Sequence, residues 1–168
     1  MKKTLIIFLS LALTNCNKQH TEFKVVSKVT KPITLDTIIS EESDRAGIDP
    51  LLTKAIIWKE SKNKSEASYE EKSLRKLFNI DQRTARGLMQ VVPGWHLKPC
   101  GLESSSDLLD PRTNIRCGLK HLQSCFYRQK SPSKTKRFEG AIACYNAGNK
   151  PSPKYVKDVA GILQKMMG

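Results

Sequence analysis

Two Asp-Pro pairs, each followed by a periodic run of apolar residues, constrain the fold more than any other feature of this sequence. An aspartate accepts hydrogen bonds from the free N–H groups at the start of a helix, and a proline fits the first helical turn. Asp49-Pro50 and Asp110-Pro111 therefore predict two helix starts. The apolar stripes that follow have helical spacing and comprise Leu52, Ala55 and Ile56, then Ile115, Gly118, Leu119, Leu122, Cys125 and Phe126.

Further apolar stripes predict more helices elsewhere in the chain. One begins at Leu35 and ends at Ala46, with Gly47 well placed as its C-cap. Two others cover residues 138–145 and 156–163. Periodicity weakens over residues 61–109, where we expect a short helix at about 70–78. Sustained strand alternation is absent outside residues 17–34, so the chain is expected to be mainly α, with one domain over residues 35–168.

The N-terminus has the pattern of an export signal. A basic start at Lys2 and Lys3 precedes an apolar run over residues 4–12. This run is shorter than the 20 or so residues that span a bilayer. Residues 13–16, Leu-Thr-Asn-Cys, resemble a bacterial lipobox, which makes Cys16 a candidate for lipidation and membrane anchoring; the asparagine departs from that pattern, and ordinary signal cleavage is the alternative. We therefore expect a signal over residues 1–16 and a tether over residues 17–34.

The charge balance narrows the class of partner. The 168 residues include 29 Lys or Arg and 16 Asp or Glu, a formal net charge of +13. Loss of Lys2 and Lys3 with the signal lowers this charge by two. A basic exported protein is attracted to polyanions such as an anionic membrane or the carboxylate-rich bacterial cell wall, and export excludes nucleic acid as the natural partner. The alternative is that the excess charge only keeps the surface soluble.

Four cysteines follow the signal, and an even set in an oxidising compartment is typical of two disulfides. Cys117 and Cys125 lie eight residues apart on one predicted helix, a rise of about 12 Å, whereas a disulfide joins Cα atoms within about 7 Å. That pairing is excluded. Of the two pairings that remain, we favour Cys100 with Cys117 and Cys125 with Cys144.

A metal site is the competing interpretation of the same region. Cys117, His121 and Cys125 follow one another at four-residue spacing, so thiolate and imidazole ligands would lie on one helix face. We prefer the disulfides and expect no metal. No glycine loop for phosphate binding is present either, so no cofactor is expected.

Glu60 is the residue whose position is chemically unusual. Extending the Leu52 and Ile56 stripe by one turn reaches it, so a carboxyl stands where a core residue is expected. Burial disfavours the ionised carboxylate, and so does the negative end of the helix dipole near the helix C-terminus. Both effects raise the pKa, which suits a general acid. The alternative is an exposed residue in the last turn of the helix.

Four short motifs occur in the order and roughly the spacing of one known family. They span residues 35–163 and resemble the catalytic domain of soluble-type peptidoglycan lytic transglycosylases, which implies a lysozyme-like helical fold. Any one motif is weak evidence, but four in order are specific. The motifs are Glu60-Ser61, Gly87-Leu88-Met89-Gln90, Asp110-Pro111 with Asn114-Ile115 and Gly118, and residues 143–148, Ala-Cys-Tyr-Asn-Ala-Gly.

The resemblance implies roles for individual residues. Glu60 is similar to the catalytic acid and base, and Ser61 to a neighbour that helps to place the substrate. Asp110 and Asn114 match a helix start and are interpreted as structural. The substrate-binding positions implied by the resemblance are Met89, Gln90, Tyr145 and Asn146, of which Tyr145 also lies on an apolar stripe and could simply be packed.

The resemblance also implies a reaction and a partner. Lytic transglycosylases cleave the β-1,4 bond between N-acetylmuramic acid and N-acetylglucosamine and leave a 1,6-anhydro sugar, so peptidoglycan strands in the periplasm or cell envelope are the expected substrate. A lysozyme-like hydrolase that uses water and a non-catalytic wall-binding protein are the alternatives. Local opening of the wall for a secretion or conjugation apparatus would suit a small enzyme. Whether cleavage is endo or exo is left open.

The chain departs from the family pattern in two places. Twenty-six residues separate Glu60 from Gly87, more than is usual, so residues 69–83 are interpreted as an insertion. Cys144 replaces the usual alanine before the tyrosine, and a bond to Cys125 would fix that wall of the cleft. The insertion and its borders also hold carboxylates that could support a hydrolase, which needs a second carboxyl at about 5 to 9.5 Å: Glu66, Glu70, Glu71 and Asp81.

Overall fold

The computed structural model describes residues 32–70, 76–148 and 152–168. The expected signal, Cys16 and nearly all of the tether lie outside these residues and stay predictions. No helix in the described ranges is both long and apolar enough to cross a membrane. The elements, in chain order, are α1 (Leu35–Ala46), α2 (Pro50–Ser61), β1 (Ser68–Glu70), α3 (Ile80–Arg83), β2 (Thr84–Arg86), α4 (Pro93–Cys100), the 3-10 helix η2 (Ser105–Leu109), α5 (Pro111–Arg128), α6 (Lys134–Ala147) and α7 (Pro153–Met167).

The helix boundaries confirm the expected capping residues. Asp49 is the N-cap of α2 and accepts a hydrogen bond from the Leu51 N–H at 2.8 Å. Asp110 caps α5 in the same way. Gly47 ends α1 with a φ of 64°, in the left-handed region that glycine adopts without a Cβ clash. The chain is therefore mainly helical, as its apolar periodicity predicted.

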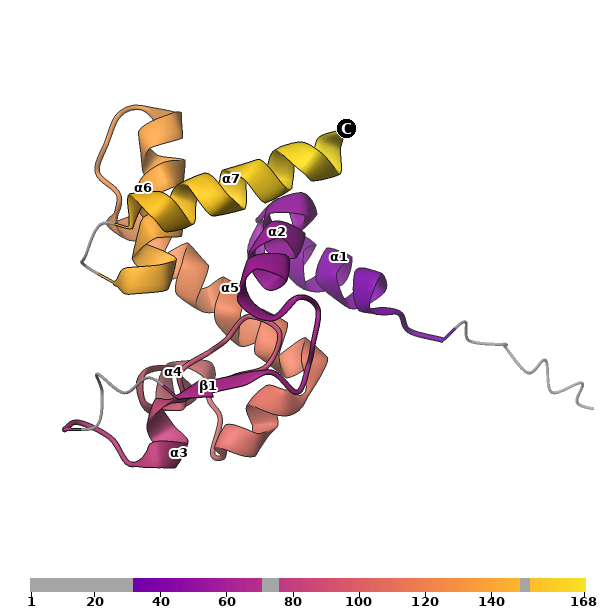
Figure 1. Ribbon diagram of the computed structural model, residues 1–168, viewed down its shortest axis with the longest axis vertical. Coiled ribbons are helices and arrows are strands. Elements are labelled where there is room, and N and C mark those ends of the chain that lie inside the picture. Colours follow the sequence, from indigo (N-terminus) through magenta and orange to yellow (C-terminus); the bar gives the residue numbers. More distant parts are fainter. Residues whose placement is uncertain (1–31, 71–75, 149–151) are drawn as a thin grey trace, which may run out of the picture. The chain divides into compact units, whose positions relative to one another are not determined.

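Helix α5 is the centre of the described domain. It packs against α1 on one side and α6 on another, while α2 packs against α7 (Figure 1). The strands, α3 and α4 lie together at the end of α5 that is away from α6 (Figure 1). The core is aliphatic, and its largest fully buried apolar side chains are Ile56, Ile57, Leu88, Met89, Leu108, Ile115, Leu119, Leu122, Ile142 and Val159.

Two disulfides fasten neighbouring helices to α5. Cys100 at the end of α4 is bonded to Cys117, and Cys125 is bonded to Cys144 on α6. This is the pairing that the sequence favoured. Because Cys117 and Cys125 are both committed to disulfides, the metal site considered for them with His121 is wrong. The described residues contain no group of three or more His, Cys, Asp or Glu side chains that could hold a metal ion.

The segment between α2 and α4 differs from the prediction. A short helix was expected at 70–78, but Glu70 belongs to strand β1, and the described helix nearby is α3. Strand β1 pairs antiparallel with β2, with Tyr69 opposite Ala85. Each strand has three residues, too few for alternation to be visible in the sequence. Residues 71–75 lie outside the description.

The junction of α1 and α5 contains a buried carboxylate. Glu42 is 2% exposed, and its oxygens accept hydrogen bonds from three arginines: Arg45, Arg112 and Arg116. These charges hold the pKa of Glu42 well below its ordinary value, at about 2. An ion-pair cluster thus joins the first helix to the central one.

Candidate active site

A cavity of about 380 Å³ lies where the strand pair, α4, α5 and α6 meet the end of α2. Its walls combine one carboxyl, two histidines, two tyrosines, two amides and small apolar side chains. Such a volume suits a ligand of sugar size. The lining residues are Glu60, Tyr69, Ala85, Gln90, Val91, Val92, His96, His121, Tyr145 and Asn146.

Glu60 lies at the position that the apolar stripe of α2 predicted. Leu52 and Ile56 are buried on that stripe, and the next turn places the half-buried Glu60 side chain in the cavity wall. Helix α2 ends one residue later at Ser61, and Lys62 continues in the left-handed conformation. The carboxyl therefore occupies the last turn of a helix whose preceding turns are anchored in the core.

Burial raises the pKa of Glu60, and this is the largest influence on the group. Two influences act the other way: a hydrogen bond from the Tyr155 hydroxyl to Oε1, and the positive charge of Lys59. Lys59 also forms an ion pair with Asp158, with Nζ and Oδ2 2.8 Å apart. The net direction is upward, so the carboxyl holds its proton at higher pH than an exposed glutamate does.

Tyr155 is a site residue that the sequence analysis missed. It lies in the first turn of α7, is 5% exposed, and points its hydroxyl at the Glu60 carboxyl. The predicted stripe of that helix began one residue later, at Val156. Tyr155 lies four residues before Val159, which is also buried, so helical spacing alone would have added it to the stripe.

The turn over residues 87–90 presents Gln90 to the cavity. Gly87 has a φ of 74° and Gln90 a φ of 48°, so the chain reverses sharply here. The Gln90 amide nitrogen donates to the carbonyls of Ala67 and Gly87, both at 2.9 Å. With both amide hydrogens used in this way, the side-chain oxygen of Gln90 is the group available to a ligand.

Asn114 explains why two of the sequence motifs occur together. It is fully buried on α5, accepts from the Met89 N–H at 2.7 Å and donates to the Arg86 and Leu108 carbonyls at 2.8 Å. A Cβ on Gly87 would lie 2.3 Å from the Asn114 amide nitrogen. Asn114 was expected to be structural as part of a helix start; its actual structural task is to hold the turn that carries Gln90.

Tyr145 and Asn146 come from the last turn of α6, and both line the cavity. The Tyr145 hydroxyl donates to the Met89 carbonyl at 2.7 Å. The ring is half-buried and packs against the core, so Tyr145 is both a packed residue and a wall of the cavity. The adjacent Cys144 is tied to α5 by its disulfide, which restrains this wall.

Comparison of the sequence with models of known families finds a match. The model described as the Transglycosylase SLT domain covers residues 37–165. The chain belongs to this family. Because the chain belongs to this family, its SLT domain has a lysozyme-like helical fold and a transglycosylase-type function related to peptidoglycan. A search of curated protein sequences gives no match.

Two residues expected to bind substrate lie elsewhere in the SLT domain. Ser61 is 6% exposed and its hydroxyl donates to the Ile57 carbonyl at 3.1 Å, one turn back along α2. Met89 is fully buried, and its sulfur lies where a Cβ on Gly118 would be 2.5 Å away. Neither side chain lines the cavity. The α2 backbone holds Ser61 and the core holds Met89, so both residues support the cavity wall without facing the cavity.

The described acidic residues in and beside the segment 69–83 do not line the cavity. Glu70 pairs with Arg83, with Oε1 and Nη2 3.1 Å apart. Asp81 forms an ion pair with Arg86 and accepts from the Ser105 hydroxyl. Glu66 is exposed, and Glu71 lies outside the described residues. Within the described ranges, Glu60 is the one carboxylate that lines the cavity.

Proposed function

We propose that this SLT domain cleaves the β-1,4 bond between N-acetylmuramic acid and N-acetylglucosamine by the non-hydrolytic route, with Glu60 acting first as acid and then as base. The observation that carries this proposal is the single described carboxylate in the cavity wall. Hydrolases of the two-carboxylate kind need a second carboxyl within about 5 to 9.5 Å. An internal nucleophile on the sugar removes that need.

The reaction requires one proton to leave Glu60 and one to return. The carboxylic acid protonates the glycosidic oxygen as the bond from that oxygen to the anomeric carbon breaks, which releases N-acetylglucosamine with a free 4-hydroxyl. The carboxylate then takes the proton of the C6 hydroxyl of N-acetylmuramic acid while its oxygen bonds to the anomeric carbon. The product is a 1,6-anhydro ring, no water is consumed, and Glu60 ends protonated.

The surroundings of Glu60 support both halves of this cycle. Burial raises its pKa and favours the acid needed first. The Tyr155 hydroxyl then stabilises the carboxylate and fixes the orientation of one of its oxygens. Gln90, Tyr145 and Asn146 line the cavity around it and are the residues proposed to hold the sugar.

The setting proposed for this activity is the periplasm or cell envelope, with peptidoglycan strands as the substrate. The signal-like residues 1–16 and the net charge of +13 support it. A lipid on Cys16 would add membrane anchoring. Local wall opening for a secretion or conjugation apparatus is the process that we propose for a domain of this size.

Mass spectrometry of digested peptidoglycan tests the reaction. The expected products are muropeptides that end in 1,6-anhydro-N-acetylmuramic acid, each lighter by one water than the reducing-end product of a hydrolase. Products that carry the full mass of water would overturn the non-hydrolytic route. Incubation in water enriched in oxygen-18 adds a direct control, since only hydrolysis incorporates the label.

A further inference from the structure

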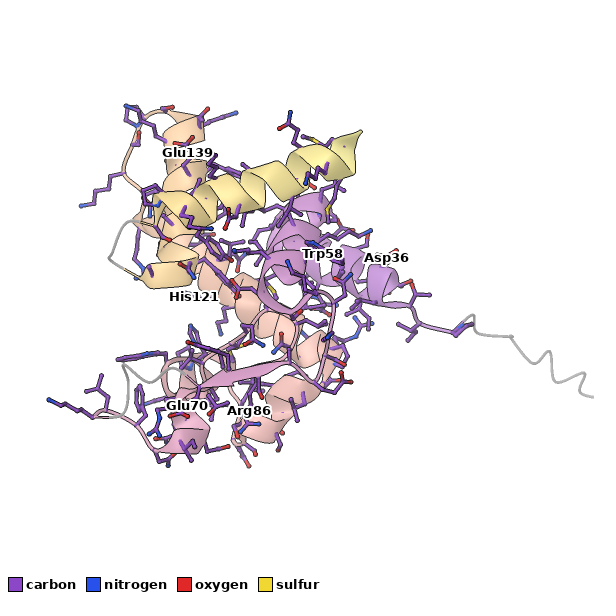
Figure 2. The ribbon with its side chains drawn as sticks, in the orientation of Figure 1. Asp36, Trp58, Glu70, Arg86, His121 and Glu139 are labelled. Atoms are coloured by element: carbon purple, nitrogen blue, oxygen red, sulfur yellow. A yellow bond between two sulfur atoms is a disulfide. The ribbon has the colours of Figure 1, made fainter. Side chains whose placement is uncertain are left out.

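Two histidines share the cavity wall with Glu60 and have no part in the reaction above. His96 lies on α4. His121 lies on α5 and is labelled in Figure 2. Their rings meet edge to face with centroids 4.5 Å apart, and the His121 ring contacts the Tyr145 ring at 5.2 Å. The three rings form a continuous wall from α4 to α6.

A disulfide fixes the geometry of this histidine pair. Cys100 lies four residues after His96, and its partner Cys117 lies four residues before His121. The covalent link is therefore about one helical turn from each ring. Side chains held in this way lose little freedom when a ligand binds, which favours binding.

Each ring already has one nitrogen engaged with the backbone. His96 Nδ1 lies 2.8 Å from the Val92 carbonyl, and a carbonyl only accepts, so this nitrogen carries the hydrogen. The His121 ring has a hydrogen bond with the backbone of Tyr145 that acts to raise its pKa, as a carbonyl that accepts from the ring does. Burial lowers the pKa of both rings, that of His121 to about 4, so both are neutral at pH 7. A neutral imidazole with one nitrogen donating has its other nitrogen as an acceptor.

We propose that His96 and His121 are substrate-binding residues that accept hydrogen bonds from the amide N–H and hydroxyl groups of an N-acetylhexosamine ring next to the scissile bond. This inference rests on the proposed function. Sugar rings offer many donors, and the pair supplies acceptors at a fixed place. Ala85, Val91 and Val92 line the same cavity and suit the methyl of an acetamido group.

The competing role is packing of α4 against α5 by two rings. Replacement by phenylalanine separates the two roles, because phenylalanine keeps an aromatic ring and removes the acceptor nitrogen. Replacement by glutamine keeps a polar group at about the reach of the far ring nitrogen. A packing role predicts that the phenylalanine variants bind sugar normally; a binding role predicts that glutamine preserves more affinity than phenylalanine does.

Calorimetric titration of a Glu60→Gln protein with N-acetylglucosamine tetramer at pH 7 measures binding without turnover. We expect the added changes His96→Phe and His121→Phe to weaken the affinity together by at least about tenfold, since buried donors of the sugar lose their partners. Tyr127→Phe is the matched control: Tyr127 lies on α5, is 85% exposed, and should leave the affinity unchanged. Unchanged affinity in the double histidine variant would overturn the inference, as would the absence of measurable binding by the Glu60→Gln protein.

The pH dependence of the same titration gives a readout that packing would not move. Protonation removes the acceptor nitrogen, so affinity should fall as the pH drops toward 4, the pKa of His121. Besides His96 and Tyr145, the charge facing this ring is Arg128, which also disfavours protonation. The fall in affinity should be smaller when His121→Phe is added to the Glu60→Gln protein. An identical fall with and without His121→Phe would overturn the inference.

Nitrogen-15 NMR of the imidazole rings covers the case in which the phenylalanine variants do not fold. In the Glu60→Gln protein, the resonance of each non-protonated ring nitrogen should shift as the tetramer saturates the site. Ring resonances that stay in place at saturation would overturn the inference. Wall digestion by the unmodified protein tests the proposed reaction independently, so failure of one is distinguishable from failure of the other.

Discussion

Two glutamates from neighbouring helices occupy sheltered places in this domain, and their protonation is driven in opposite directions. Glu42 on α1 is enclosed by three arginines, which lower its pKa to about 2. Glu60 on α2 has a neutral tyrosine as its hydrogen-bond donor and a lysine that is already paired with Asp158, and burial raises its pKa. Burial alone therefore does not decide the charge of a carboxyl; the charge of its partners does.

The contrast separates a structural carboxylate from one that suits the proposed proton transfer. At Glu42 the arginines compensate for the desolvation of the carboxylate, so the group stays ionised and joins α1 to α5. At Glu60 the compensation is partial. The folded state there accommodates the protonated Glu60 carboxyl, and a cavity lies next to it. These are the conditions for proton transfer to a ligand.

The largest expected effect is on catalysis at Glu60. Glu60→Gln removes the transferable proton and should lower the rate of wall digestion by at least about a hundredfold. It should also raise the free energy of unfolding at pH 7, because it replaces a half-buried carboxylate whose ionisation opposes folding. That gain is expected to vanish at pH values below the ordinary glutamate pKa. Glu139→Gln, an exposed change on α6, is the control (Figure 2), and activity near the unmodified level in Glu60→Gln would refute the acid role.

The matching change at the other glutamate should act on stability. Glu42→Gln leaves three arginines around a neutral amide and should lower the free energy of unfolding by about 2 kcal/mol, less than a fully enclosed pair because the arginines reach solvent. Urea denaturation followed by circular dichroism measures it. Glu41→Gln removes an exposed partner of Arg112 and should cost less than about 1 kcal/mol. Equal effects of the two changes would contradict the distinction between them.

A smaller effect is expected from the tyrosine that contacts Glu60. Tyr155→Phe removes the hydrogen bond that lowers the pKa of Glu60, so that pKa should rise further. The alkaline limb of the pH–activity profile, which reports loss of the acid, should then move to higher pH, and the rate at its optimum should fall about tenfold. Tyr127→Phe should leave the profile in place. A limb that moves to lower pH would show that Tyr155 acts in some other way.

The smallest expected effect is the response of stability to acid. The pKa of Glu42 in the folded state, about 2, lies below the ordinary value of 4.5, so its contribution is present above pH 4.5 and is lost as the pH falls toward 2. After allowance for screening by solvent, about 1 kcal/mol of the loss between pH 5 and pH 3 should come from Glu42. Unfolding curves of Glu42→Gln should show an acid loss smaller by this amount, and parallel curves would exclude Glu42 as its source.

Local signals in the sequence predicted α1, α2, α5, α6 and α7, but they missed α3, α4 and η2. The caps at Asp49, Asp110 and Gly47 act within a few residues, so their hydrogen bonds and φ values follow from neighbours in the chain. Exclusion of the Cys117–Cys125 pair also needed only the rise of one helix. The strand pair escaped prediction because three-residue strands are defined by a partner 14 or more residues away, as in the pairing of Tyr69 with Ala85.

The candidate site, like the fold, was predicted in part from the sequence. Glu60 was identified from the sequence, because an α-helix repeats every 3.6 residues and a carboxyl on a core stripe stands out. Met89 was expected to line the cleft and Ser61 to help to place the substrate; neither side chain lines the cavity, and Tyr155 was missed. Sequence spacing tells which face of a helix a residue occupies, but it carries no information about which other element meets that face.

By itself, the sequence determined α1, α2, α5, α6 and α7, the caps of three of these helices and the one carboxyl that breaks an apolar stripe, because these depend on contacts within a few residues. Only the tertiary structure decided what surrounds each carboxyl. Three arginines from two helices meet Glu42, and a tyrosine from the last helix meets Glu60. Charge and desolvation act through space, so the difference between an ionised structural glutamate and one with a raised pKa arises when distant segments pack together.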